Sequence, residues 1–155
     1  MSRTPLSTQL REYLIEWPAL DWPIDWTLVF GRTAPIDVEI GFGNGGFLAE
    51  LAAARPEHDF VGVERSLASV QRVFKRIERA GLKNVRLVLG DAVFVVEQLF
   101  GPHAIAQLYV NFPDPWPKER HHGRRLIRPV FLDLVGRRLV RNGEVMVATD
   151  HPNYA

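Results

Sequence analysis

The sequence contains no cysteine, and this absence removes several kinds of chemistry. Disulfide bonds, thiolate nucleophiles and thiolate metal sites are all excluded. His121 and His122 are adjacent, which makes it difficult for them to share one metal ion, and no acidic residue follows them at helical spacing. The sequence therefore predicts no metal site.

Long apolar runs are also missing. No stretch approaches the roughly 18 apolar residues that a membrane span requires, and residues 1–10 lack the apolar core of a signal peptide. The chain has 155 residues, of which 46% are apolar and 24% charged, as in a globular domain with a sizeable core. We expect a single cytoplasmic domain with no membrane partner.

The net charge is only +1, but the charges are unevenly distributed. Residues 1–64 carry 4 Lys/Arg against 10 Asp/Glu, whereas residues 65–155 carry 15 against 8, so the two parts stand at −6 and +7. A basic second part suggests a polyanionic partner. Solvated helix faces rich in arginine would give the same counts.

The stretch from Ile36 to Gly46 is the strongest local signal, because an apolar strand runs directly into a glycine cluster. A helix is predicted to follow from Phe47 to Ala54. Glycine permits sharp turns and lets a ligand approach the backbone, and the start of a helix offers free N–H groups. This arrangement can hold a dinucleotide or the ribose and carboxypropyl parts of S-adenosylmethionine.

Two cofactor patterns fit the same loop. The dinucleotide pattern G-x-G-x-x-G is met at positions 41, 43 and 46. The methyltransferase pattern E-x-G-x-G-x-G is met by Glu39, Gly41, Gly43 and Gly45. Glu64 ends the next apolar run, where either cofactor class needs a carboxylate for ribose hydroxyls. The pattern alone leaves both cofactors open.

Residues 1–35 are predicted to form an aromatic, proline-rich arm, and residues 36–155 a Rossmann-like domain. The arm should contain a short helix around Leu6 to Ile15, with its tryptophans packed across the carboxyl edge of the sheet or, alternatively, stacked on a ligand. Strand and helix patterns alternate from residue 36 onward, which predicts an α/β, doubly wound, mostly parallel sheet. Strands are expected at 36–40, 60–63, 85–89, 105–110 and 144–148, and helices at 47–54, at 92–100, and from Pro129 to before Gly143. A further helix is expected between Ser66, as its N-cap, and Gly81, with an apolar face made of Val70, Val73, Phe74 and Ile77.

Acidic residues lie just past four of the expected strand ends. They are Glu64, Asp91, Asp114 and Asp150. In doubly wound sheets ligands bind at the carboxyl ends of the strands, where the glycine loop also lies. Four acids at one edge of the sheet therefore predict a site.

The segment from Asn111 to His122, N-F-P-D-P-W-P-K-E-R-H-H, is the most specific in the chain. Three prolines within five positions fix the loop that carries Asp114. This segment resembles the signature of the tRNA (guanine-N7)-methyltransferase family, and the glycine motif, Glu64, Asp91 and the strand ending in Asp150 fall where that family has them. The resemblance covers about Phe30 to the end.

The resemblance implies an S-adenosylmethionine-dependent methyltransferase fold and an enzyme that acts on a tRNA guanine, in the variable loop. It implies that Glu39, Glu64 and Asp91 contact the cofactor, Glu64 at the ribose hydroxyls and Asp91 near the adenine amino group. Asp114 would lie beside the methyl group and the guanine as the catalytic residue, and Lys118 and Asp150 would hold the substrate. Two simpler roles stay open: Asp91 could cap a helix, and Glu39 could bond backbone in the glycine loop.

The chemistry is independently reasonable, because guanine N7 carries a free lone pair. Methyl transfer to it needs no nucleophilic side chain and no deprotonation, only in-line positioning. Methylation makes the purine cationic, so a fixed carboxylate such as Asp114 would stabilise the charge as it develops.

Two clusters of basic residues are candidates for contact with tRNA phosphates. The first, the basic loop, is opposed only by Glu119. It comprises Lys118, Arg120, His121, His122, Arg124, Arg125 and Arg128. The second, the helix stripe, comprises Arg72, Lys75, Arg76 and Arg79, and an ordinary solvated helix face would look the same.

Three rival functions remain at this stage. The first is a nicotinamide dehydrogenase, which would leave the proline-fixed loop unexplained. The second is an amino-group DNA methyltransferase, which would have Asn/Asp-Pro-Pro-aromatic at the fourth strand, where this sequence has Asn-Phe-Pro-Asp. The third is a non-catalytic RNA-binding domain, which would bind no cofactor. Family members usually continue past the fifth strand with a helix and two strands that complete the guanine pocket. The sequence ends at Ala155, so we expect a fragment.

Overall fold

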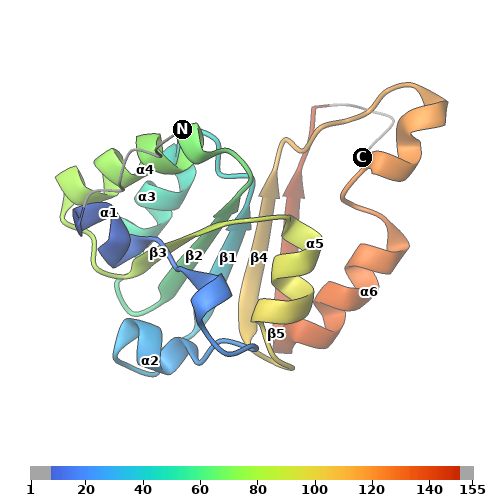
Figure 1. Ribbon diagram of the computed structural model, residues 1–155. Helices are drawn as coiled ribbons and strands as arrows, with labels where there is room; N and C mark the ends of the chain where they lie inside the picture. The colour runs from blue at the N-terminus through green and yellow to red at the C-terminus, as the bar shows by residue number, and fades with distance from the viewer. Residues whose placement is uncertain (1–7, 151–155) are drawn as a thin grey trace.

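The computed structural model describes residues 8–150, which fold around one parallel five-stranded sheet (Figure 1). The strand order is β3-β2-β1-β4-β5, and every neighbouring pair is parallel. The predicted doubly wound parallel sheet is thus confirmed. The strands are β1 (Ile36–Ile40), β2 (Asp59–Glu64), β3 (Val85–Leu89), β4 (Ile105–Asn111) and β5 (Leu139–Ala148).

Helices cover both faces of the sheet (Figure 1). One face packs against α1 (Thr8–Tyr13), α3 (Gly46–Ala54) and α4 (Leu67–Ala80). The other packs against α5 (Ala92–Phe94), the π-helix η2 (Val95–Leu99) and α6 (Pro129–Arg138). Within residues 8–150, no helix has both the length and the apolar character needed to cross a bilayer.

The central strand β1 marks the point in the sheet where the strand order reverses. Val38 and Ile40 belong to the core on the α6 side, and the alternate side chains Asp37 and Glu39 point toward α3. Its neighbours β2 and β4 are reached by crossovers to opposite sides. The chain therefore reverses its strand order at β1, and such a point leaves a crevice beyond the carboxyl ends of the strands.

Helix α4 follows the predicted local signals. The Ser66 hydroxyl accepts a 3.2 Å hydrogen bond from the Ser69 N–H, which caps the start of the helix. Gly81 ends it in the left-handed conformation at φ 66°. Val70, Val73 and Ile77 are fully buried and Phe74 is partly buried against the same cluster, so the predicted apolar face is confirmed.

The arm before β1 contains three short helices in its described part, whereas we predicted one. The predicted helix appears as α1 in the described part, since residues 1–7 lie outside it. In the 3-10 helix η1 (Trp17–Ala19), the Trp17 indole N–H donates to the Leu89 carbonyl at 2.9 Å, at the carboxyl end of β3. The Trp26 indole in α2 (Trp26–Phe30) instead stacks on Phe100 at 4.8 Å. The predicted packing at the carboxyl edge thus holds for Trp17 and is wrong for Trp26.

The end of α6 and the start of β5 both lie earlier in the chain than the sequence predicted. Helix α6 ends at Arg138 rather than close to Gly143, because Leu139 is extended and pairs with Ile105 of β4. A register shift follows before the regular pairing from Glu144 onward. The basic loop contains the 3-10 helix η3 (Glu119–Arg124).

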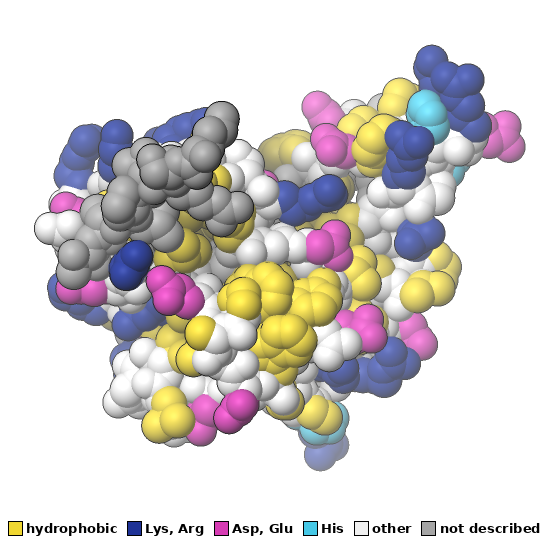
Figure 2. All heavy atoms as spheres, in the orientation of Figure 1, with side chains coloured by type: hydrophobic (Ala, Val, Ile, Leu, Met, Phe, Trp, Pro, Cys, Tyr) yellow, Lys and Arg dark blue, Asp and Glu magenta, His cyan; other side chains and the backbone are white. Residues whose placement is uncertain are grey.

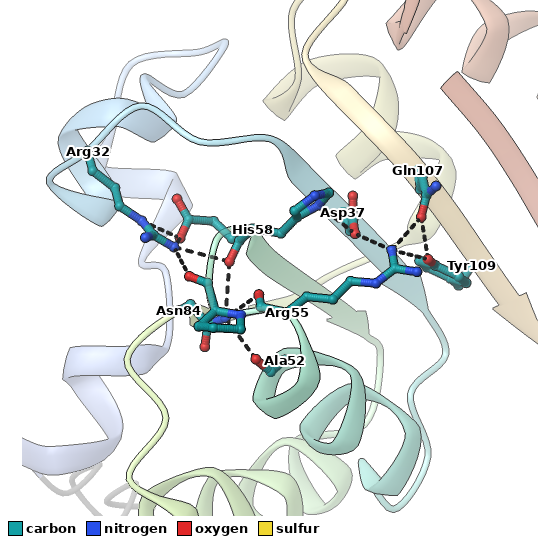
Figure 3. Close-up of polar contacts among 10 residues, drawn as sticks. Arg32, Asp37, Ala52, Arg55, His58, Asn84, Gln107 and Tyr109 are labelled. Atoms are coloured by element: carbon teal, nitrogen blue, oxygen red, sulfur yellow. Dashed lines mark hydrogen bonds and ion pairs between the residues drawn. The ribbon is translucent and has the colours of Figure 1, made fainter. Parts of the chain in front are cut away.

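A polar network ties the opposite, amino-terminal part of the sheet to the end of α3 (Figure 3). The buried Asp37 carboxylate lies 3.1 Å from His58 Nδ1 and 3.8 Å from the Arg55 guanidinium. The Asn84 amide donates to three backbone carbonyls, those of Ala52, Arg55 and His58. Burial raises the pKa of Asp37, against the pull of these cations. One oxygen of Asp37, Oδ1, has no hydrogen-bond partner among residues 8–150, and the other contacts of the network are made within the fold.

Candidate active site

A cavity of about 590 Å³ lies at the carboxyl edge of the sheet, beside the lobe formed by residues 112–128. Figure 2 shows basic side chains gathered on this lobe and the hollow between it and the body of the molecule. Strands β1, β2, β3 and β4 contribute to the cavity at or just past their ends, and three of the four predicted acids, Glu64, Asp91 and Asp114, line it, whereas Asp150 does not. The lining residues are Ile40, Gly41, Val63, Glu64, Arg65, Gly90, Asp91, Ala92, Val93, Val110, Asn111, Phe112, Pro113, Asp114, Trp116, Arg124, Arg125, Leu126 and Arg128.

The glycine loop adopts the left-handed conformations that the sequence predicted. Gly41, Gly43 and Gly45 have φ of 70°, 56° and 77°. Gly45 is the most constrained, because a Cβ there would lie 1.7 Å from the Val73 side chain of α4. Only glycine lets the start of α3 pack this closely against α4. Among the three, Gly41 lines the cavity directly.

Glu64 connects the end of β2 to the glycine loop. One carboxylate oxygen accepts a 3.3 Å hydrogen bond from the Gly43 N–H, and the other accepts from the Arg65 N–H at 2.9 Å. The side chain is half-buried and lines the cavity. The carboxylate is therefore fixed at the cavity wall with lone pairs that can accept further hydrogen bonds.

Asp91 both caps a helix and faces the cavity. Its Oδ2 accepts a 3.0 Å hydrogen bond from the Phe94 N–H at the start of α5, so the simpler role considered from sequence is real. The residue is exposed and lines the cavity. Capping uses one oxygen, which leaves the carboxylate able to accept from a ligand as well.

Glu39 lies deeper than the other acids and is not among the cavity-lining residues. It is 3% exposed, and its Oε2 accepts a 3.1 Å hydrogen bond from the Asn111 amide rather than from the glycine-loop backbone. Its Oε1 has no hydrogen-bond partner among residues 8–150. Burial raises the pKa of Glu39 to about 7, and Glu64 adds to this rise against the hydrogen bond from Asn111.

The loop after β4 supplies the opposite wall of the cavity. Its backbone is held by a 2.6 Å hydrogen bond from the Phe112 N–H to the Ala148 carbonyl, and by one of the same length from Arg125 Nε to the Pro115 carbonyl. Asp114 is exposed between these two anchors. The carboxylate is thus accessible on a loop that is fixed at both ends.

The predicted substrate-binding residues divide into two groups. Arg124 lines the cavity, and its guanidinium lies 5.0 Å from the centre of the Trp116 ring. Arg125 also lines it, but it is only 9% exposed, because it is used to anchor the loop. It is therefore placed as a structural side chain rather than as the exposed phosphate contact we expected.

The remaining predicted substrate residues lie outside the cavity lining. His121 packs its ring edge-on to Trp116 at 5.7 Å. Lys118 and Arg120 are exposed on the surface of the lobe, and Asp150 is exposed just past β5. The structure thus brings together Gly41 of the glycine loop, Glu64, Asp91, Asp114 and Arg124 in the lining of one cavity. The other predicted substrate residues, Lys118, Arg120, His121 and Asp150, are not part of that lining.

Three site features were not found from the sequence. Asn111 contacts Glu39 across the β1–β4 pair, and no local pattern signals a contact over 72 residues. Arg65 and Trp116 line the cavity. Their positions, directly after Glu64 and inside the proline-fixed loop, could have indicated this. In the part of the chain that the structure describes, no group of three metal-binding side chains occurs.

Comparisons with known proteins identify the family of this chain. Residues 33–155 match the model of a family described as "Putative methyltransferase". A tRNA (guanine-N(7)-)-methyltransferase of Thermotoga maritima is 50% identical over 134 residues, which cover 86% of this chain and 43% of the relative. A protein of the same name from Sodalis glossinidius is 42% identical and is matched over 96% of this chain and 65% of its own length. The chain is therefore shorter than both relatives.

Solved structures show the same fold at low sequence identity. An antibiotic-related methyltransferase superposes with a TM-score of 0.61 at 17% identity, covering 84% of this chain and 65% of that one. A 30S ribosomal A1408 methyltransferase from an uncultured bacterium gives 0.60 at 14% identity, covering 84% and 62%. The fold is that of S-adenosylmethionine-dependent methyltransferases. With most of its length matched by the family model, the chain belongs to this methyltransferase family.

Proposed function

We propose that this protein transfers a methyl group from S-adenosylmethionine to N7 of a guanine in tRNA, in the variable loop, and acts in the cytoplasm. The observation that carries the proposal is the single cavity with two different walls. Glu64, Asp91 and the glycine loop form one wall, and the loop of Asp114 with Arg124 forms the other. The names of the relatives support tRNA as the substrate.

The first wall suits the cofactor. Glu64 would accept from the ribose hydroxyls, and Asp91 would accept from the adenine amino group. The N–H groups at the start of α3 and the buried carboxylate of Glu39 suit the carboxylate and ammonium ends of the methionine part. When bound, S-adenosylmethionine supplies an electrophilic methyl group on a sulfonium.

The second wall suits the guanine. Asp114 would orient the base through hydrogen bonds to its edge, and its charge would stabilise the cationic purine as the methyl group arrives. No side chain has to act as nucleophile or base, because N7 attacks with its own lone pair. The reaction is therefore compatible with a cavity whose lining, within residues 8–150, contains no side-chain thiol or hydroxyl.

The surface around the second wall suits RNA. Arg124 lies at the cavity, and Lys118, Arg120 and His121 lie on the same lobe, so phosphates on either side of a flipped guanine could be held there. Asp150, at the neighbouring strand end, would contact the substrate nucleotide. The helix stripe on α4 is a separate candidate surface.

The test is labelled methyl transfer to tRNA transcripts that carry no modification, followed by nucleoside analysis. The expected product is 7-methylguanosine, lost when the variable-loop guanines are replaced by adenine. Methyl incorporation at another base would replace the proposal with a different nucleic-acid methyltransferase. Binding of tRNA without any methyl transfer or cofactor binding would indicate a non-catalytic RNA-binding domain.

A further inference from the structure

Phe112 is an apolar side chain in an unusual place. It is 67% exposed, yet it lines the cavity, two positions before Asp114. The side chains that precede it on β4, such as Val110 and Leu108, are buried in the core. Exposure alone would not distinguish Phe112, since Leu28 and Val130 are more exposed, but Phe112 is the one of these three that lines the cavity.

The backbone holds this ring in place at a conformational cost. Phe112 has φ 51°, in the left-handed region that residues other than glycine rarely adopt. The hydrogen bond from its N–H to the Ala148 carbonyl, at 2.6 Å, fixes that conformation, and Pro113 restricts the peptide that follows. Strained backbone of this kind concentrates at functional sites, where it directs a side chain.

The two aromatic side chains of the cavity are not equivalent. Trp116 already has the Arg124 guanidinium 5.0 Å from its ring centre and His121 at its edge. The Phe112 ring makes no ring–ring or cation–π contact with another residue in the range 8–150. Its faces are thus available to a flat ligand, and those of Trp116 are partly used.

We propose that the Phe112 ring stacks on the target guanine and stabilises the positive charge that methylation places on it; this inference rests on the proposed function. In the reaction, the bond between sulfur and the methyl carbon breaks, its electron pair stays on sulfur, and the N7 lone pair forms the new bond. No proton moves. The purine gains the positive charge that the sulfonium loses, and an aromatic face attracts a cation more strongly than a neutral ring.

The experiment compares Phe112→Leu with Phe112→Trp in single-turnover methyl transfer at saturating cofactor. Leucine keeps a Cβ and apolar bulk without a π-face, and tryptophan keeps the π-face. We expect Phe112→Leu to slow transfer about 10-fold or more, the size of one base–aromatic stacking interaction. Phe112→Trp should stay within about threefold of the parent, because tryptophan keeps a π-face on which a base can stack.

The matched control is Phe30→Leu, because Phe30 in α2 carries the Arg86 guanidinium 5.0 Å from its ring centre and does not line the cavity. It should leave transfer unchanged. A second readout is the affinity for methylated against unmodified tRNA. The parent should favour the methylated form, and Phe112→Leu should remove most of this preference.

Different failures have different meanings. If the parent makes no 7-methylguanosine, the proposed function is wrong and the inference falls with it. If the parent is active and Phe112→Leu is equally fast, only the inference is overturned. A loss of cofactor affinity in Phe112→Leu would also overturn it, because the ring would then belong to the cofactor's wall.

Discussion

The side-chain amide of Asn111 donates a 3.1 Å hydrogen bond to the buried carboxylate of Glu39, and so joins the end of β4 to the end of β1. Asn111 begins the loop of Asp114, and Glu39 precedes the glycine loop. One contact therefore connects the proposed base wall with the proposed cofactor wall. The charge state of Glu39 should influence both.

Burial raises the pKa of Glu39 from 4.5 to about 7, so its effect on stability depends on pH. Between these values the folded chain keeps a proton that the unfolded chain has released. The contribution of Glu39 to the free energy of unfolding is therefore largest below pH 4.5, falls as the pH rises from 4.5 through 7, and is constant above that. The difference corresponds to about 3 kcal/mol.

Glu39→Gln should remove this dependence. The variant should gain stability relative to the parent as the pH rises from 5 to 8, by up to about 3 kcal/mol. Urea unfolding at several pH values measures it, and Asp37 is common to both chains, so its contribution cancels. A parent and a variant with parallel pH profiles would contradict a protonated Glu39 in the folded state.

Glu64→Ala should weaken S-adenosylmethionine binding by about 1.5–3 kcal/mol, the typical value of a hydrogen bond to a charged group. The change also frees the Gly43 N–H, so the glycine loop should lose order. Calorimetry measures the affinity, with Glu50→Ala on the exposed side of α3 as control. Tight binding of a nicotinamide dinucleotide and no response to S-adenosylmethionine would reject the cofactor assignment.

Asp114→Asn should cause a large fall in single-turnover methyl transfer with cofactor affinity retained. The amide keeps the size and hydrogen-bonding capacity of the side chain and loses the charge, which matters most when the purine becomes cationic. Asp133→Asn on α6, an exposed acid paired with Arg137 at 3.4 Å, is the control. Transfer at the parental rate would remove Asp114 from the mechanism.

Local signals allowed much of the fold to be predicted. The bounds of β1 and β3, the Ser66 cap and the Gly81 end of α4 are as expected, because each depends on residues close in sequence. The site acids were expected at one edge for the same reason, since parallel strands bring their carboxyl ends together. Three of the four acids, Glu64, Asp91 and Asp114, line the cavity, and Asp150 does not.

Contacts between distant segments could not be predicted. Trp26 packs on Phe100, and Leu139 joins β4 early, because tertiary neighbours decide the position of each residue. The basic loop looked uniform in sequence, but Arg125 is buried there and Arg124 is exposed. Charge counts carry no information on which arginine anchors the loop.

Arg124→Glu should weaken tRNA binding and reduce its salt dependence. With one phosphate contact fewer, binding of tRNA releases fewer counterions. Arg137→Glu, on the exposed side of α6, is a control of equal charge change. A triple change of Arg72, Arg76 and Arg79 to Glu tests the helix stripe, whose cations form no ion pair within residues 8–150. The measurement is a tRNA titration at two salt concentrations. If a variant binds tRNA as tightly as the parent at both concentrations, the surface that it alters does not contact tRNA.

Arg125→Lys should act through the loop rather than through phosphates. Lysine keeps the charge but cannot place an N–H at the position of Arg125 Nε, which donates to the Pro115 carbonyl at 2.6 Å. Asp114 and Trp116 lie on either side of Pro115, so both should lose their fixed positions. We expect faster amide exchange over residues 111–118 and slower methyl transfer, with cofactor affinity and the salt dependence of tRNA binding unchanged.

Arg124→Lys is the matched control for this change, because it alters the neighbouring side chain with the same chemistry. That arginine lies over Trp116 and gives no hydrogen bond to the Pro115 carbonyl. Its replacement should leave amide exchange at 111–118 close to the parent. If Arg125→Lys instead flattens the salt dependence and leaves exchange unchanged, Arg125 contacts phosphate in the complex, and the loop is held by Phe112 and the prolines alone.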